Sequence, residues 1–177
     1  IPLNKFKISK SLKKQIKRKF FKITFNKKFE EVINSCAKKT NKRPSTWINK
    51  KIINVYSNLN KLGYAHSIEV WRKNKLVGGL YGVSLGSAFF GESMFSLVPN
   101  ASKISLVYLI TILKIKKFKL LDTQLINSHL KTLGAIEISR SKYLKLLANS
   151  LKKTINFKKK IPKNLFQETL QSIIHTS

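Results

Sequence analysis

The sequence predicts an α+β fold in which a mixed, largely antiparallel sheet is flanked by helices. Three features of the chain lead to this class. Helical periodicity dominates residues 1–64, the apolar period shortens to two residues from His66, and helices alternate with strands beyond Ala101. Early hairpins followed by helical crossovers are typical of a mixed sheet and argue against a doubly wound one.

Helices are expected through most of the N-terminal portion. Ser9 or Ser11 can cap a strongly basic first helix, and Gly63 is a typical helix terminator. Residues 21–25 alternate as a strand does. Amphipathic periodicity predicts the helices of this portion at 9–19, 28–38 and 49–62.

Strands are expected from His66 onward. Ile68 and Val70 point to one face and Glu69 to the other, and polar residues at 73–75 make a turn into the next strand. Three consecutive antiparallel strands follow, from His66, at 76–83 and at 88–95.

The second half of the chain combines helices and strands. Pro99 and Asn100 precede a long apolar helix, and the strand that follows it is expected to be central in the sheet. The expected elements are a helix at 101–115, a strand at 119–124, a short helix from Ser128, a strand at 135–138 and a helix at 141–151. These elements predict three parts: a helical N-terminal portion (1–64), a sheet-containing core (65–151) and a basic, weakly amphipathic tail (152–177).

The charge of the chain is extreme. Its 36 Lys and Arg face seven Asp and Glu, which gives a net charge of +29. Such a field predicts a polyanionic partner, and nucleic acid is the partner that this composition favours. An AT-rich coding sequence could also supply the lysines, but it does not explain the scarcity of Glu, whose codons are AT-rich too. The basic stretches 10–19 and 152–160 are expected to contact phosphates without reading sequence.

The remaining composition excludes several kinds of site. Cys36 is the single cysteine, so the chain forms no internal disulfide and no thiolate zinc site. His66, His129 and His175 lack the spacing of metal ligands. No apolar stretch reaches the ~18 residues of a membrane span and no signal peptide pattern is visible, so a reducing, cytoplasmic setting is expected. The chain begins at Ile1 rather than Met, which predicts a fragment.

Asp122 is the only aspartate, and it ends an apolar run two residues before Gln124. Because the sequence has so few acidic residues, a carboxylate in a half-buried strand indicates a functional site more than a residue that only keeps the protein soluble. Residues i and i+2 of a strand point to the same face, about 7 Å apart. Asp122 and Gln124 are therefore expected to address one substrate together.

Glu92 lies within the aromatic segment 89–96 and shares a strand face with Met94. A buried carboxylate is costly unless it is paired or hydrogen-bonded. A structural ion pair and a substrate contact both satisfy that requirement, and the residues alone leave both open.

Two further features have a functional and a structural interpretation. Five glycines cluster between Gly78 and Gly91, where they indicate bulges and turns or the close approach of a ligand to the sheet. Trp47 lies in a loop between helices and could stack on a base or pack in the core. A tryptophan or histidine placed as Trp71 and His66 are packs in the core more often than it forms part of a functional site.

In their order along the chain, these segments resemble the leucyl/phenylalanyl-tRNA–protein transferase family of bacteria. The resemblance extends over nearly the whole chain to about Leu147, and the ordered set is highly specific. The matching segments are 8–11, 46–48, 66–71, 78–83, 90–96, 100–103, 122–124, 129–130 and 133–135.

The resemblance implies a GNAT-like acyltransferase fold with no metal and no cofactor. It implies transfer of Leu or Phe from Leu-tRNA or Phe-tRNA to the N-terminal Arg or Lys of an acceptor protein, which marks that protein for degradation. The enzyme would be a monomer without a membrane partner. The residues it assigns are Asp122, Gln124 and Glu92 as catalytic residues, Trp47 as a substrate-binding residue, and Leu80, Met94 and Leu109 as walls of an apolar pocket for the Leu or Phe side chain.

Two departures from the family pattern are visible. The N-terminal domain of the family, with its Phe-Pro-Trp element, has no counterpart ahead of residue 8. The cysteine that is usual between the aspartate and the glutamine is replaced by Thr123, at a strand position expected to face the opposite way.

The chemistry implied is simple because an aminoacyl-tRNA ester is already activated, so the site mainly positions the attacking amine. Gln124 would accept a hydrogen bond from that amine through its carbonyl oxygen. Asp122 would hold Gln124 or draw the proton onward. Glu92 and Asp122 would balance the charge of a cationic acceptor side chain.

Two other functions stay open from the residues alone. An acetyl-CoA-dependent N-acetyltransferase would share the fold, but such enzymes bind pyrophosphate in a Gly-rich loop before the main helix, and segment 96–101 has no glycine. A non-enzymatic basic RNA-binding module fits the charge equally well, but it leaves Glu92, Asp122 and Gln124 without a role.

Overall fold

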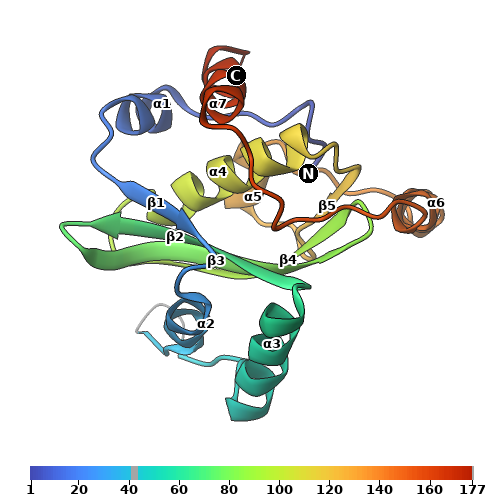
Figure 1. Cartoon of the computed structure of the whole chain (residues 1–177), viewed down its shortest axis with the longest axis horizontal. Coiled ribbons are helices and arrows are strands. Elements are labelled where there is room, and N and C mark those ends of the chain that lie inside the picture. Colours follow the sequence, from blue (N-terminus) through green and yellow to red (C-terminus); the bar gives the residue numbers. More distant parts are fainter. Residues whose placement is uncertain (41–43, 177) are drawn as a thin grey trace.

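The computed structural model of the chain describes residues 1–40 and 44–176 and contains a five-stranded sheet flanked by helices (Figure 1). The strands are β1 (Lys22–Phe25), β2 (Ala65–Arg72), β3 (Lys75–Leu85), β4 (Ala88–Ser96) and β5 (Leu120–Asp122). The helices are α1 (Lys10–Lys17), α2 (Phe29–Ala37), α3 (Lys50–Leu62), α4 (Ala101–Ile115), α5 (Ser128–Thr132), α6 (Arg140–Leu151) and α7 (Lys163–Thr176).

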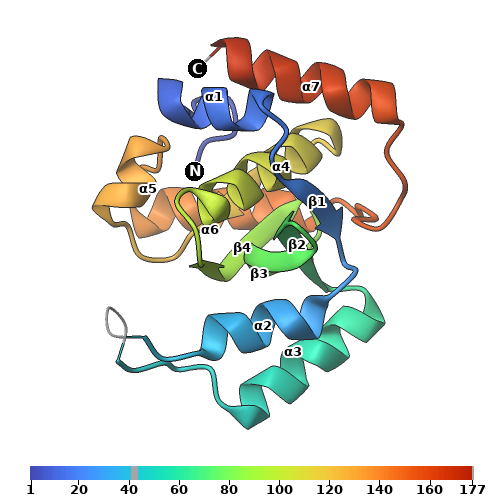
Figure 2. The same ribbon diagram turned by 90° about the vertical axis from the view of Figure 1, so that its left-hand side faces the viewer.

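The sheet is mixed, with the strand order β1-β2-β3-β4-β5. The first four strands pair antiparallel, and β5 pairs parallel to β4 after the crossover through α4. α2 and α3 cover one face of the sheet, while α4 lies on the other face with α1 and α7 beyond it (Figures 1 and 2). The structure therefore confirms the α+β class and the mixed, largely antiparallel sheet.

Local sequence signals account for several helix ends. The side chain of Ser9 accepts a hydrogen bond from the Leu12 backbone N–H, as an N-cap residue does, and Asn49 caps α3 in the same way. Gly63 ends α3 with a φ of +91°, a left-handed conformation that glycine adopts without strain.

Two of the expected elements were wrong. The strand expected at 119–124 ends at Asp122, and it lies at the edge of the sheet rather than at its centre. Residues 135–138 form no strand, because the Ala135 N–H bonds back to Leu130 and closes the end of α5. The weakly amphipathic tail forms α7, whose buried face packs against α4.

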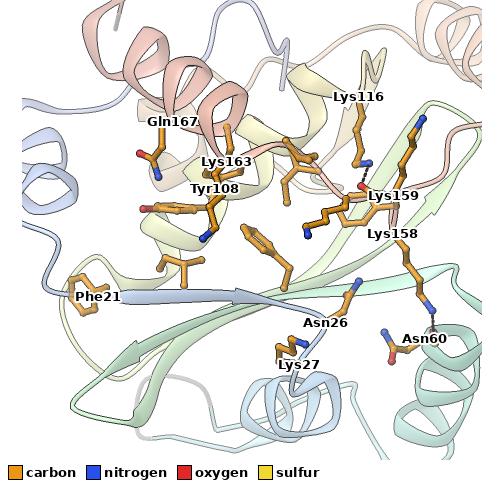
Figure 3. A pocket seen from close by; sticks show the side chains of 17 residues that line it. Phe21, Asn26, Lys27, Asn60, Tyr108, Lys116, Lys158, Lys159, Lys163 and Gln167 are labelled. Atoms are coloured by element: carbon orange, nitrogen blue, oxygen red, sulfur yellow. Dashed lines mark hydrogen bonds between the residues drawn. The ribbon is translucent and has the colours of Figure 1, made fainter.

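The segment between α6 and α7 is held by two lysines (Figure 3). The Lys116 Nζ atom donates to the backbone oxygens of Asn156 and Lys159 at 3.0 and 2.7 Å. The Lys158 Nζ atom lies 3.4 Å from the backbone oxygen of Asn60. These bonds fix the C-terminal segment against α4 and α3.

The glycine cluster is explained by packing within the sheet and against α4. A Cβ atom on Gly78 would lie 2.4 Å from the Ala101 Cβ, and one on Gly82 would lie 2.2 Å from the Phe90 backbone oxygen. Gly86 has a φ of +59° in the turn between β3 and β4. These contacts favour the structural interpretation of the cluster over a ligand that approaches the sheet.

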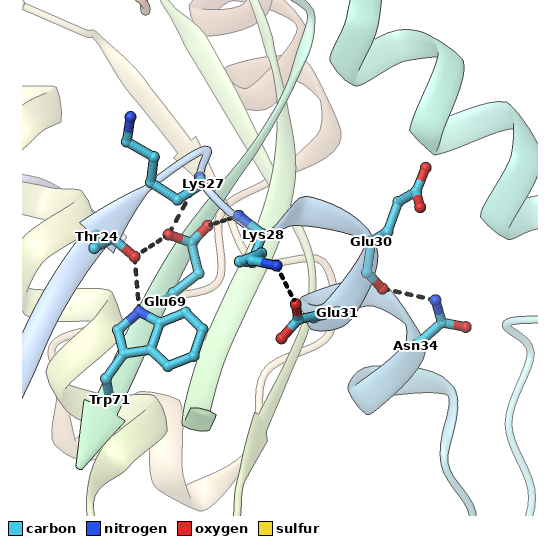
Figure 4. A network of polar contacts seen from close by, with 8 residues as sticks. All are labelled: Thr24, Lys27, Lys28, Glu30, Glu31, Asn34, Glu69 and Trp71. Carbon is cyan, nitrogen blue, oxygen red and sulfur yellow. Dashed lines mark hydrogen bonds and ion pairs between the residues drawn. The ribbon is translucent and has the colours of Figure 1, made fainter. Parts of the chain in front are cut away.

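Glu69 is fully buried, and four donors satisfy its carboxylate. Figure 4 shows the donors from Thr24, Lys27 and Lys28. The Ser67 hydroxyl lies 2.5 Å away, the Thr24 hydroxyl also donates, and the backbone N–H groups of Lys27 and Lys28 each lie at 3.4 Å. The network ties β1 and the start of α2 to β2.

His66 is a buried core residue of β2, with 1% of its surface exposed. Its two ring nitrogens contact the side chains of Asn26 and Ser84 at 3.1 and 3.0 Å, and its ring stacks on Phe157 at 4.0 Å. Burial, together with the charge of Lys158, lowers the pKa of His66 to about 4.

None of the helices in the described part of the chain is long and apolar enough to cross a membrane.

We expect Glu69→Ala to lower the free energy of unfolding by about 3 kcal/mol, because it leaves buried hydroxyl and N–H donors without an acceptor. Urea unfolding at neutral pH would measure the loss. Glu31→Ala is the matched control, because Glu31 forms an exposed ion pair with Lys28 at 2.8 Å that should contribute little to stability. Equal losses in the two variants would contradict a structural role for the Glu69 network.

We also expect His66 to make stability fall with acid. Its pKa is lower in the folded chain than the 6.5 of an exposed histidine, so its contribution is complete above pH 6.5 and is lost as the pH falls through 4. The change corresponds to about 3 kcal/mol between pH 7.5 and pH 4. Urea unfolding at both pH values should show a smaller acid loss in His66→Leu than in the unmodified chain. Parallel pH profiles in the two proteins would refute the assignment.

Candidate active site

A cavity of about 220 Å³ opens where β4 and β5 separate. It contains five of the seven site residues expected from the sequence. Its lining comes from β3, β4, α4, β5 and the chain after β5: Leu80, Tyr81, Gly91, Glu92, Ser93, Met94, Leu106, Leu109, Leu121, Thr123, Gln124, Leu125, Asn127 and Leu130.

A β-bulge places Glu92 at this cavity. Gly82 of β3 pairs with Gly91, but the preceding Tyr81 pairs with Ser93, so Glu92 is the extra residue of β4. A bulge bends its strand and redirects side chains, and bulges are common beside active sites. Glu92 and Met94 both line the cavity, as their shared strand face predicts.

Asp122 and Gln124 meet through a turn rather than through a common strand face. β5 ends at Asp122, and Gln124 has a φ of +59°. The Asp122 Oδ1 atom accepts a hydrogen bond of 2.7 Å from the Gln124 backbone N–H, which is an Asx-type turn. The Gln124 Nε2 atom then donates to the Glu92 Oε2 atom at 3.1 Å. The three polar residues thus form one connected chain, although the geometry expected for them was wrong.

The apolar side of the cavity is formed by buried residues. Leu80 is 3% and Leu109 1% exposed, and Met94 is half-buried. Thr123 also lines the cavity, because the chain turns after Asp122, so its expected orientation away from the site was wrong.

Trp47 does not line this cavity but lies in a row of aromatic rings that leads to it. It is 51% exposed and contacts Tyr56 edge to face at 6.4 Å, and Tyr56 contacts Tyr81 in the same way at 5.3 Å. The Tyr81 hydroxyl is buried and has no hydrogen-bond partner among the described residues. Since buried polar groups are nearly always paired, this atom marks a place for a ligand or a water molecule.

Two tyrosines that the sequence analysis missed contact the carboxylates. Burial, the charge of Glu92 and a hydrogen bond to it raise the pKa of Tyr56 to about 12. Burial and a 2.8 Å hydrogen bond from the Tyr143 hydroxyl to the Asp122 Oδ2 atom raise the pKa of Tyr143 to about 12. Both stay protonated donors at neutral pH. Neither has a local sequence signal, because each meets its partner only through the tertiary fold.

Within the part of the chain that the structure describes, no three His, Cys, Asp or Glu side chains gather closely enough to hold a metal ion. Asp122 and Glu92 instead have hydrogen-bond donors as partners. In a chain of net charge +29, these two carboxylates create a local site for a cation.

The fold is α+β, and two carboxylates and an amide lie beside an apolar cavity in it. Residues 1–148 match the model of the leucyl/phenylalanyl-tRNA protein transferase family. The chain belongs to this family.

Three curated relatives carry the name leucyl/phenylalanyl-tRNA–protein transferase. The protein from Maricaulis maris (strain MCS10) is 48% identical over 177 residues, which is 100% of this chain and 82% of the relative. Those from Rhizorhabdus wittichii and Zymomonas mobilis subsp. mobilis are 52% and 53% identical over 147 and 151 residues. The matches cover 83% and 85% of this chain but only 59% and 56% of these two relatives.

Solved structures with a similar fold include two acetyltransferases. One is an aminoglycoside acetyltransferase from an uncultured soil metagenomic sample, with a TM-score of 0.49 and 15% identity over 68% of this chain and 91% of that one. The other is a ribosomal-protein-alanine N-acetyltransferase from Brucella melitensis biovar Abortus 2308, with a TM-score of 0.49 and 12% identity over 67% of this chain and 94% of that one.

We expect Glu92→Gln to lower the pKa of Tyr56, because it removes the negative charge that disfavours the phenolate. Burial remains, so the pKa should fall from about 12 but stay above 10. NMR titration of chains labelled at the tyrosine Cζ atoms would measure it. Asp122→Asn is the matched control, which should lower the pKa of Tyr143 and leave that of Tyr56 unchanged. A Tyr56 pKa that Glu92→Gln does not move would rule out the contact.

Proposed function

We propose that this chain is an aminoacyltransferase that moves Leu or Phe from aminoacyl-tRNA to the N-terminal Arg or Lys of an acceptor protein and so marks the acceptor for degradation. The observation that carries this proposal is an apolar cavity of about 220 Å³ directly beside the connected residues Glu92, Gln124 and Asp122. The apolar part suits a Leu or Phe side chain, and the polar part suits a cationic amine. Membership of the transferase family supports the reaction class.

The reaction requires no covalent enzyme intermediate. The neutral α-amine of the acceptor attacks the carbonyl carbon of the aminoacyl ester, so a C–N bond forms as the ester C–O bond breaks. The amine loses one proton, and the ribose hydroxyl of the tRNA leaves with one. Because the ester is already activated, holding amine and ester together accounts for much of the catalysis.

Gln124 is suited to orient the attacking amine. Its Nε2 atom donates to Glu92 at 3.1 Å, which leaves the side-chain carbonyl oxygen as an acceptor. Asp122 fixes Gln124 through the backbone N–H bond of 2.7 Å. In this scheme Gln124 contacts the amine, and Asp122 positions Gln124.

The carboxylates also account for an acceptor with a basic N-terminal residue. A chain of net charge +29 repels cations unless negative groups stand where the cation binds. Glu92 and Asp122 supply two such groups at one cavity edge. Charge-assisted hydrogen bonds to Arg or Lys are stronger than neutral ones, so these residues favour basic acceptors.

Trp47 is suited to stack on a base of the tRNA donor. Half of its surface is exposed, and Tyr56 supports its ring from one side. A base on an aromatic ring contributes about 1–3 kcal/mol without sequence readout. In our proposal the enzyme acts as a cytoplasmic monomer and needs no metal or cofactor for this chemistry.

The acetyl-CoA alternative is disfavoured by the start of α4, where a pyrophosphate would bind. The Ser102 N–H there donates to the Ser96 hydroxyl, and Asn100 donates to Gln15 of α1 at 3.0 Å. The non-enzymatic alternative, a basic RNA-binding module, gives no role to the residues around the cavity.

We expect this chain to transfer labelled leucine from Leu-tRNA to a peptide that begins with Arg and not to one that begins with Gly. The Maricaulis relative, assayed in parallel, would show that the substrates are competent. Tight tRNA binding with no transfer to either peptide, while the relative is active, would favour the RNA-binding module.

In an active chain, Gln124→Ala and Asp122→Ala should each lower kcat/KM by about 10²-fold, because the first removes the contact to the attacking amine and the second removes the acceptor that positions Gln124. Thr123→Ser, at the residue between them, should have little effect. Full transfer rates in both of the first two variants would refute the roles assigned here.

A further inference from the structure

A second and larger cavity lies beside a different part of α4. Its volume is about 870 Å³, and β1, α4, the end of α3 and the C-terminal segment form its walls. Tyr108 and Ile112 line it from α4, and Lys116 lines it from the C-cap of that helix. Figure 3 shows Tyr108 and Lys116 in the wall. No residue lines both this cavity and the candidate active site.

The wall of this cavity carries many lysines. No Asp or Glu lines it within the described part of the chain. We call it the lysine groove, after Lys27, Lys116, Lys158, Lys159, Lys160 and Lys163.

The lysines of the groove fall into two sets. Lys116 and Lys158 bond to backbone oxygens and hold the C-terminal segment in place. Lys159, Lys160 and Lys163 are exposed and form no ion pair with a described residue. Burial and the charge of Lys159 lower the pKa of Lys116. The six lysines of the lining, with no acidic residue among the described lining residues, concentrate positive charge here. A site of this kind attracts an anion with several charges.

Aromatic rings lie among these lysines. Phe166 of α7 contacts Phe25 at 5.9 Å and Tyr108 at 5.7 Å, and Phe21 lines the groove at the start of β1. Basic grooves with aromatic rings are typical of proteins that bind single-stranded nucleic acid, because bases stack on the rings while phosphates meet the cations.

Part of the groove lies outside the part of the chain that the family model covers. The match ends at residue 148, and residues 157–167 supply eight of the seventeen lining residues. The active site described above does not use this segment.

We propose that the lysine groove binds the sugar–phosphate backbone of RNA, with an unpaired base against its aromatic rings. The RNA is the tRNA part of the donor, away from its aminoacyl end, and to this extent the inference rests on the proposed function. A recessed aromatic surface suits flat bases better than it suits a membrane surface. An acidic peptide would use the cations but not the rings.

The test compares two triple variants with the same change of charge. Lys159, Lys160 and Lys163 are changed to Gln in one, and the exposed Lys50, Lys51 and Lys75, which line neither cavity, in the other. Binding of fluorescent, unacylated tRNA is measured over a range of salt concentrations. The groove variant should bind tRNA roughly tenfold more weakly than the unmodified chain. The slope of its log affinity against log salt concentration should fall by about two to three units. Both changes should be much smaller in the control variant.

A second readout separates this inference from the proposed function. The groove variant should lose kcat/KM with Leu-tRNA but keep it with leucyl-adenosine, a donor too small to reach the groove. If the unmodified chain transfers leucine from neither donor, the proposed function fails, and the binding difference alone still reports on the groove.

Equal tRNA affinity in the two triple variants would overturn the inference. Vesicles of phosphatidylcholine and phosphatidylserine, and an oligoglutamate peptide, serve as the other anionic probes. If the groove variant lost affinity for either of these and kept its affinity for tRNA, the groove would belong to a membrane or an acidic protein instead.

Discussion

The parallel pairing of β4 with β5 is the constraint on which the site depends. It extends over three residue pairs, from Ala88 and Leu120 to Phe90 and Asp122, and then stops. β4 continues to Ser96 while the chain after Asp122 turns away. Backbone N–H and C=O groups of a strand need hydrogen-bond partners. The bulge at Glu92 and the turn at Gln124 both lie just beyond the point where the β4–β5 ladder ends. The cavity is the space left between the diverging segments.

Positive and negative side chains lie in different parts of the molecule. Most of the many lysines lie on the surface, where their summed field attracts a polyanion over long distances. The carboxylates of Glu92 and Asp122 are partly buried beside the cavity, and that of Glu69 is buried in the sheet. In the proposed function, attraction of RNA and reception of a cationic amine are opposite electrostatic tasks, and charges of the two signs lie in different parts of the fold.

The elements with local signals could be predicted from the sequence. Caps such as Ser9 and Gly63, the period-two strands and the apolar helix α4 depend on residues close together in the chain. The edge position of β5 could not be predicted from the sequence, because a buried edge strand and a buried central strand have the same apolar pattern. Asp122, Gln124 and Glu92 were predicted from their residue types and positions together with the family resemblance, whereas the contacts of the two carboxylates with Tyr56 and Tyr143 arise only from tertiary packing.

The bulge has a consequence for how the chain can vary. Glu92 is one residue in excess of β3, and the pairs on either side of it, Gly82 with Gly91 and Tyr81 with Ser93, would be continuous without it. Deletion of one residue at this point would therefore remove the bulge and leave Met94 opposite Leu80. It would also remove the irregular position from which Glu92 reaches Gln124. The carboxylate of the candidate site thus stands on a residue that the sheet does not need for its pairing.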